Sequence, residues 1–355
     1  MKNRILALDG WRTIASLGVV WIHTWTFCGN PALKLLGVNI FQPLAILGNG
    51  VDFFFVISGF CLYLILKDKP ITASTYKTFI KNRWLRIGPA FYICATVALF
   101  AMTKVFNVEN LKLLFYNFSY LNNIIPYNGN ANSSITPPFW SLAVEFQFYI
   151  LLPFMLMASS KIGIKKTLYT LFALGLCMNF IFTADENKYH LVTKVCHFTL
   201  GIFAAVIFLE KKVKPQILTQ YWGLFLGIIA MFFGRYTMSD AYVHNANNLI
   251  SLFSKALGPI FLVGGFTLVM LNTITSEKTG KWLANPVLQF YGKISYSVYL
   301  WHYFLLSLVL PYLQKISIVA SLQPVFLFLM SMLVITPVSY ASYYFIERLY
   351  LNKKK

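Results

Sequence analysis

Ionisable side chains inside long apolar segments are the residues of this sequence best suited to chemistry. The apolar stretch LDGWRTIASLGVVWIHTWTF carries Arg12 near one end and His23 eleven positions later. A guanidinium suits phosphate because its planar fork of N–H donors matches phosphate oxygens. An imidazole suits general-base work because it titrates near neutral pH. The pair predicts an anion-binding group and a proton acceptor on one helix, about three turns apart.

Other apolar segments carry ionisable residues as well, namely Asp52, Glu145, His197, Lys255 and His302. A charged side chain at the centre of a bilayer costs about 2.5–3.5 kcal/mol on insertion scales, so each residue is a functional candidate. The alternative is that each joins two helices through a hydrogen bond worth about 0.6 kcal/mol. For an isolated histidine this structural alternative is slightly favoured.

Composition places the chain in a membrane. Of its 355 residues, 58% are hydrophobic and only 12% are charged, and the mean hydropathy is +0.64. A spanning helix needs about 20 apolar residues, and about ten such segments occur. They are predicted at 12–30, 40–66, 88–106, 139–159, 167–183, 190–209, 221–238, 249–272, 290–312 and 322–346. We therefore predict an all-α integral membrane protein, a bundle of about ten transmembrane helices, with 1–355 as a single domain.

The net charge of +19 is explained by topology. If the N-terminus is cytoplasmic, most lysines and arginines fall on the inner side, as the positive-inside rule requires. An even number of helices then places both termini in the cytoplasm. Nucleic acid is thereby excluded as a partner. The five cysteines include no CxxC pair, so neither a metal site nor a disulfide framework is predicted.

The depth of the ionisable residues follows from the rise of about 1.5 Å per helical residue. Arg12 begins its helix at the inner face, which puts His23 near the midplane. Asp52 and His302 reach a similar depth, and Glu145 lies nearer the outer surface. If their helices are neighbours, the four residues form one polar site that faces outward, made of His23, Asp52, Glu145 and His302.

Two predicted loops carry further polar residues. The outer loop at 107–138 is rich in Asn, and its amides are predicted either to bind sugar hydroxyls or only to be solvated. The inner loop at 67–88 carries KTFIKNRWLRIGP. Its basic residues are mostly explained by topology, with an anionic ligand as the alternative.

With these residues identified, the whole chain resembles the acyltransferase-3 family of multi-pass membrane O-acyltransferases. LDGWRTIASLGVVWIHT resembles the family's first helix with its Arg and His signature pair, and GVDFFFVISGF resembles the second helix. RWLRIGP resembles the inner Arg-x-x-Arg loop, and FWSLAVEFQFYILLP the Trp-Ser-Leu and Glu motif. GKISYSVYLWHYFLL and YYFIERLY are similar as well. The chain departs at VEFQFY, where a second acidic residue or Gln often follows the first, and at Gly88, where an aromatic is common.

The resemblance implies transfer of an acyl group, by default acetyl, from cytoplasmic acetyl-CoA to a hydroxyl of an envelope polysaccharide such as lipopolysaccharide O-antigen. The protein would lie in the bacterial inner membrane, with acyl-CoA, the glycan and lipids as its partners. We expect the stand-alone form of the family, without the C-terminal esterase-like domain that some relatives carry, and direct delivery of the acyl group to the acceptor.

The same resemblance assigns roles to individual residues. Arg12, Arg83 and Arg86 would hold donor phosphates, and His23 would act as general base or as a covalent acyl carrier. Glu145 would support catalysis beside Trp140 and Ser141 on the acceptor side. Asp52 and His302 would orient the imidazole or the substrate, with a purely structural role left open.

Two rival interpretations remain at this point. A transporter or flippase of a lipid-linked sugar would also place ionisable groups near the midplane, but we find no internal duplication of the kind that favours one. A non-catalytic scaffold would leave Arg12 and His23 replaceable. Acyl-CoA turnover by the purified protein separates the enzyme from both.

Overall fold

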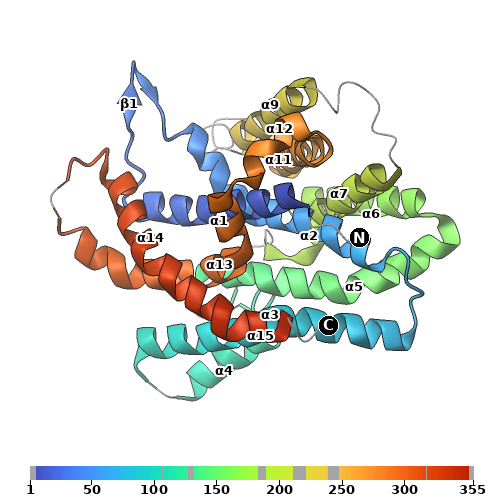
Figure 1. Cartoon of the computed structure of the whole chain (residues 1–355), viewed down its shortest axis with the longest axis horizontal. Coiled ribbons are helices and arrows are strands. Elements are labelled where there is room, and N and C mark those ends of the chain that lie inside the picture. The colour runs from blue at the N-terminus through green and yellow to red at the C-terminus, as the bar shows by residue number, and fades with distance from the viewer. Residues whose placement is uncertain are drawn as a thin grey trace. The chain divides into compact units, whose positions relative to one another are not determined.

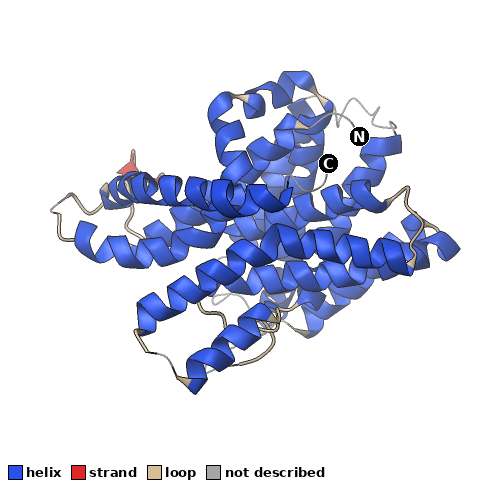
Figure 2. Cartoon of the chain, turned by 60° about the horizontal axis from the view of Figure 1, so that its bottom comes forward, coloured by secondary structure: helices blue, strands red, loops and turns tan. Residues whose placement is uncertain are grey.

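The computed structural model of the chain describes residues 5–105, 107–126, 132–182, 189–210, 221–238, 248–316 and 318–351. These residues are almost entirely helical, as Figures 1 and 2 show. The strands within them are β1 (Lys34–Leu35) and β2 (Val38–Asn39), which pair antiparallel as a small hairpin. The prediction of an all-α protein is confirmed.

Each predicted apolar segment overlaps one helix. The ten helices concerned are α1 (Leu6–Phe27), α2 (Gly50–Leu66), α3 (Ala73–Thr103), α5 (Trp140–Ile162), α6 (Ile164–Ile181), α7 (Leu191–Glu210), α9 (Tyr221–Thr237), α11 (Asn248–Thr275), α13 (Pro286–Leu313) and α14 (Gln323–Ser342). Shorter elements are the helices α4 (Val108–Phe118), α12 (Glu277–Gly280) and α15 (Arg348–Leu351), the 3-10 helices η1 (Pro43–Asn49), η2 (Pro137–Phe139) and η4 (Lys281–Ala284), and a π-helical turn, η5 (Tyr343–Glu347).

Eight helical segments in the described residues are long and apolar enough to cross a membrane. They are Pro43–Leu66, Ala73–Thr103, Pro137–Ile162, Ile164–Ile181, Leu191–Glu210, Leu249–Thr275, Pro286–Leu313 and Gln323–Tyr350. α9 has only 17 residues, and α1 includes Asp9, Arg12 and His23 among its 22. Crossing by α1 and α9, a total of ten spans and the cytoplasmic location of both termini therefore stay predictions.

The chain divides into two compact units, and each is built from three stretches of sequence. Unit 1 comprises Met1–Arg12, Asp52–Thr78 and Gln147–Gln289. Unit 2 comprises Thr13–Val51, Phe79–Phe146 and Phe290–Lys355.

In unit 1, glycines let α2 and α7 approach each other closely. A Cβ atom added at Gly59 would lie 2.2 Å from the carbonyl oxygen of Phe198, and one added at Gly201 would lie 2.0 Å from that of Val56. Small residues allow such backbone contact between membrane helices. Asp52, Val56 and Gly59 share one face of α2 because they are four and three residues apart. The close contact therefore also holds Asp52 toward α7.

In unit 2, the second half of α1 is fixed by packing. A Cβ atom added at Gly50 would lie 2.3 Å from the carbonyl oxygen of Ala15, so the chain passes directly against α1 there. Trp21 and Trp25 form a buried cluster with Phe41 and its neighbours. Trp21 also meets the ring of Phe328 on α14 edge to face, at 5.9 Å between centroids. Because these tryptophans flank His23, their packing sets the position of that residue.

The structure corrects both predicted loops. α3 begins at Ala73, so most of the 67–88 segment is helix. α3 has 31 residues, and at about 1.5 Å per residue it is longer than the roughly 30 Å hydrocarbon core. Polar turns at its N-terminal end therefore extend the apolar part of the helix beyond the core. Sequence reasoning counted only the apolar part, although Lys, Arg and Leu are good helix formers.

The 107–138 segment contains α4, which is capped by the side chain of Asn107 accepting from the backbone N–H of Asn110 at 2.9 Å. Asn117 is buried, and its Nδ2 donates to the carbonyl oxygens of Leu113 and Ser133 at 2.8 and 2.9 Å. At least some of these amides thus hold the segment together, a role that neither predicted alternative included.

Candidate active site

Two imidazoles from distant parts of the sequence lie together in unit 2. The ring centroid of His23 on α1 is 5.3 Å from that of His302 on α13, and the rings are tilted by 31°. Tyr303 meets the His23 ring edge to face at 5.0 Å. His302 is completely buried, whereas His23 is half-buried. The structure therefore brings together two of the predicted site residues and adds Tyr303.

The surroundings of His302 define its hydrogen-bonding state. Its Nδ1 lies 2.5 Å from the carbonyl oxygen of Tyr299. A carbonyl can only accept, so Nδ1 carries the proton in this contact. In a neutral ring Nε2 is then an acceptor, and this buried atom has no hydrogen-bond partner among the described residues. Buried polar atoms nearly always have a hydrogen-bond partner. An acceptor such as Nε2 of His302, unpaired beside the imidazole of His23, is therefore a candidate functional group.

Tyr299 connects α13 to the start of α5. Its hydroxyl donates to the carbonyl oxygen of Pro138 at 2.7 Å and lies 2.6 Å from Oγ of Ser141. Glu145, one turn further along α5, interacts electrostatically with Tyr299. Trp140 is the first residue of α5. The predicted acceptor-side residues therefore lie on the first turns of a helix that is tied to the His302 helix. Sequence reasoning missed Tyr299, because the search for polar groups inside the apolar segments covered only His, Asp, Glu and Lys.

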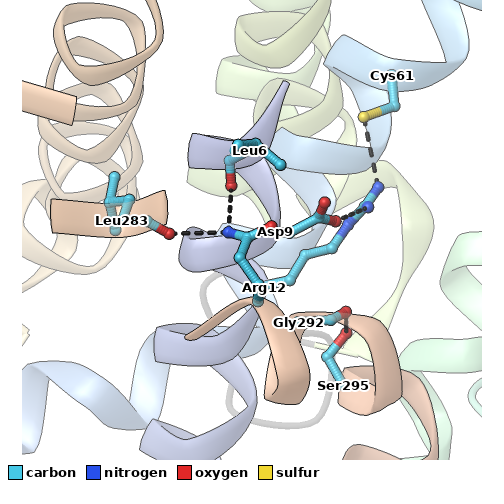
Figure 3. Close-up of polar contacts among 8 residues, drawn as sticks. Leu6, Asp9, Arg12, Cys61, Leu283, Gly292 and Ser295 are labelled. Carbon is cyan, nitrogen blue, oxygen red and sulfur yellow. Dashed lines mark hydrogen bonds and ion pairs between the residues drawn. The ribbon is translucent and has the colours of Figure 1, made fainter. Parts of the chain in front are cut away.

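Arg12 lies in unit 1, where two contacts hold its guanidinium. Nη1 is 3.0 Å from Oδ1 of Asp9, one turn earlier on α1. Nη2 donates to Sγ of Cys61 on α2 at 3.5 Å. Figure 3 shows Asp9 and Cys61 beside the guanidinium. Asp9 was not among the predicted site residues, although its spacing of three from Arg12 is typical of a helical ion pair.

Asp52 forms a buried charged cluster with α7, also in unit 1. Its Oδ1 is 2.9 Å from Nζ of Lys194 and 3.1 Å from Nε2 of His197. His197 is fully buried. Sequence reasoning found Asp52 and His197 separately, and Lys194 could have been found by its spacing of three from His197. Action of Asp52 on His23 stays a prediction. Lys255 is an exposed residue of α11.

Arg83 and Arg86 lie on α3 in unit 2. Arg83 is 7% exposed, and its guanidinium carbon is 5.9 Å from the ring centroid of Phe79. Arg86 interacts electrostatically with Glu347, a buried residue that also hydrogen-bonds Ser297. Sequence reasoning gave Glu347 no role. A single phosphate site formed by both of these arginines and Arg12 stays a prediction.

The fold and these clusters define the class to which the chain belongs. The long apolar helices make it a multi-pass membrane protein. Residues 5–344 match the family model Acyl_transf_3, described as an acyltransferase domain. The chain belongs to this acyltransferase family, and the resemblance in its sequence motifs is confirmed.

Relatives from Staphylococcus aureus are similar over most of this chain. A protein of strain COL, provisionally named an O-acetyltransferase, is 29% identical over 343 residues, which cover 87% of this chain and 52% of the relative. O-acetyltransferase OatA of strain NCTC 8325 / PS 47 is 26% identical over 372 residues, covering 96% of this chain and 56% of OatA. The chain thus spans about half the length of these relatives. No solved structure matches.

Proposed function

We propose that the protein is a membrane O-acetyltransferase that moves the acetyl group of acetyl-CoA to a hydroxyl of an envelope polysaccharide. The observation that carries this proposal is the His23 and His302 pair, a half-buried imidazole beside a buried acceptor nitrogen. Membership of the acyltransferase family supports the reaction type. The names of the relatives support O-acetylation.

In the proposed reaction, His23 removes the proton of the acceptor hydroxyl as its oxygen attacks the thioester carbonyl. The new C–O bond forms, the C–S bond breaks, and the departing coenzyme A thiolate takes up the proton from the imidazolium. Protons and charge balance without another reactant. General-base catalysis of this kind contributes about 10²–10⁴-fold to a rate. An acyl-histidine intermediate is the alternative chemistry for the same residue.

The donor would bind through arginines. Arg12 lies eleven residues before His23 on α1, which is about 16 Å along the helix axis. A phosphate held at Arg12 would leave the flexible arm of coenzyme A to reach toward the imidazole. Arg83 and Arg86 are the further candidates for phosphate, since guanidinium contacts to phosphate are strong and directional.

The acceptor would be held on the side of His302. Its Nε2 is able to accept a hydrogen bond, so it suits either the N–H of His23 or a sugar hydroxyl. Ser141 and Glu145 supply hydroxyl and carboxylate groups near Tyr299. Trp140 supplies an aromatic group at the start of the same helix, α5. We propose a surface polysaccharide such as O-antigen as the acceptor and the bacterial inner membrane as the location.

The decisive experiment measures acetyl transfer from labelled acetyl-CoA by the purified protein, with mass spectrometry of surface glycans from cells that do or do not express it. His23→Ala should lower the rate by about 10²–10⁴-fold at an unchanged expression level. Normal glycan acetylation by the His23→Ala variant would contradict the proposed role of His23. A purified wild-type protein that never turns over acetyl-CoA is the second possible result, and it would contradict the enzymatic function. The second result would favour transport of a lipid-linked sugar.

A further inference from the structure

We infer that Asp9 is a positioning residue that fixes the guanidinium of Arg12 for the donor phosphate. This inference rests on the proposed function, because it concerns the same donor site. It adds a residue whose role is to orient Arg12 rather than to touch the substrate.

Contacts at both terminal nitrogens hold the guanidinium of Arg12. Asp9 Oδ1 contacts Nη1 at 3.0 Å, and Cys61 Sγ accepts from Nη2 at 3.5 Å. Because the two contacts engage the two terminal nitrogens, they fix both the direction of the side chain and the plane of the guanidinium. Figure 3 shows both contacts.

The pair of Asp9 and Arg12 is largely shielded from solvent. The side chain of Asp9 is 5% exposed, and that of Arg12 is 24% exposed. Burying a carboxylate is costly unless it is paired, so a contact this well shielded differs from the ion pairs of a solvated surface, which contribute little. An unrestrained Arg side chain carries about 2 kcal/mol of rotamer entropy. Holding it in place before the donor arrives spares part of that loss on binding.

The backbone that carries Asp9 is itself anchored. Trp11 Nε1 donates to Oγ1 of Thr273 at 2.8 Å. A Cβ atom added at Gly10 would lie 2.6 Å from the carbonyl oxygen of Leu283, so α1 rests directly on that residue. Gln289 Nε2 donates to the carbonyl oxygens of Leu6 and Leu283, both at 2.9 Å. The carboxylate is thus presented from a fixed helix end.

The competing view is that Asp9 merely neutralises Arg12 and must be displaced by phosphate. The two views predict opposite changes in the affinity for the donor when Asp9 is removed. If Asp9 positions Arg12, its removal weakens donor binding. If Asp9 competes with phosphate, its removal strengthens binding, because a repelling carboxylate is lost.

The test measures equilibrium binding of coenzyme A to the purified full chain in detergent, together with the steady-state kinetics of acetyl transfer. Asp9→Ala should weaken coenzyme A binding by about tenfold, as expected for loss of a hydrogen bond to a charged group. Asp9→Asn should weaken it by only about threefold, because the amide oxygen still accepts from Nη1. Both variants should raise KM for acetyl-CoA and leave kcat within about twofold, since an interaction equal in ground and transition states affects KM alone.

A matched control is Glu109→Ala, which breaks an exposed ion pair of the same spacing, Glu109 with Lys112 at 2.7 Å on α4. It should leave coenzyme A binding unchanged. Thermal unfolding checks that each variant is folded, and Asp9→Asn keeps the test valid if Asp9→Ala does not fold. Unchanged or tighter binding by the Asp9 variants would overturn the inference.

Arg12→Ala separates this inference from the proposed function. If Arg12→Ala loses coenzyme A binding and the Asp9 variants keep it, only the role of Asp9 is wrong. If Arg12→Ala binds coenzyme A like the wild type, the donor site itself is misplaced.

Discussion

The imidazole of His302 lies 5.3 Å from that of His23, and its Nδ1 is engaged by the carbonyl oxygen of Tyr299. This contact leaves Nε2 as the acceptor of the ring. The backbone of α13 therefore determines which nitrogen of His302 is offered to the site. Because a main-chain carbonyl sets this proton position, substitution of neighbouring side chains should not change it. The role of His302 is therefore tested by substitution of His302 itself.

His302→Phe should lower kcat for acetyl transfer by about 10²-fold, because a misplaced catalytic group or substrate costs about that factor. Phenylalanine keeps a planar ring and removes both nitrogens. Coenzyme A affinity should stay at the wild-type value. Tyr291→Phe is the control, since it removes a hydrogen bond from the same helix, to Thr336 on α14 at 3.0 Å, and should leave kcat unchanged. A fully active His302→Phe would mean that the imidazole is structural.

The helices were predictable because a bilayer requires long apolar segments, and each predicted segment overlaps a helix. The polar turns that extend these helices beyond the apolar segments were not predictable in this way. Arg83 and Arg86 were expected in a loop, but they lie on the N-terminal half of α3, where propensity rather than hydropathy decides.

Part of the candidate site was predictable as well. A depth estimate put His23 and His302 at one level, and the structure adds that their helices are neighbours in unit 2. Residues that contact the predicted site residues through a hydroxyl group, or that lie one helical turn from them, were not predicted. Tyr299 is one of 21 tyrosines, so its residue type carried no signal. Asp9 and Lys194 were close in sequence to recognised residues, and spacing of three on a helix was the available clue.

The close contact between α2 and α7 predicts that neither Gly59 nor Gly201 tolerates a side chain. Gly201→Ala would place a Cβ atom 2.0 Å from the carbonyl oxygen of Val56, a backbone atom that cannot rotate away. Overpacking of this kind costs about 1–3 kcal/mol, so the yield of folded protein and the thermal midpoint should both fall. Gly264→Ala is the control, because a Cβ atom there meets nothing within 4 Å. Equal stability of the two variants would contradict the close packing of α2 on α7.

The Asp52 cluster should behave as a buried ion pair. Lys194→Met leaves Asp52 without its lysine partner and should lower the free energy of unfolding by about 3–5 kcal/mol. Asp52→Asn combined with Lys194→Met removes both charges and should recover most of that loss, which denaturant or thermal unfolding in detergent would measure. Asp68→Ala, at an exposed pair with Lys67, serves as a control and should have little effect. If the double variant is no more stable than Lys194→Met, the charges do not compensate each other.

Cys61 offers a reporter of donor binding that needs no turnover. Its Sγ lies 3.5 Å from Nη2 of Arg12, and the residue is half-buried. A phosphate bound at Arg12 should cover the thiol and slow its alkylation by N-ethylmaleimide. At a concentration of desulfo-coenzyme A ten times its Kd, the rate should fall about tenfold, in proportion to the unoccupied fraction. This analogue keeps the phosphates but lacks the thiol of coenzyme A, which would itself consume the maleimide.

Mass spectrometry of the modified peptides measures this rate, and the exposed Cys177 in the same molecule reports on the reagent itself. Desulfo-coenzyme A should leave the alkylation of Cys177 unchanged, and Arg12→Ala should abolish the protection of Cys61. Protection that persists in Arg12→Ala would place the donor phosphates elsewhere. Because the reporter and Arg12 both belong to unit 1, the measurement tests the donor site independently of the imidazole pair in unit 2.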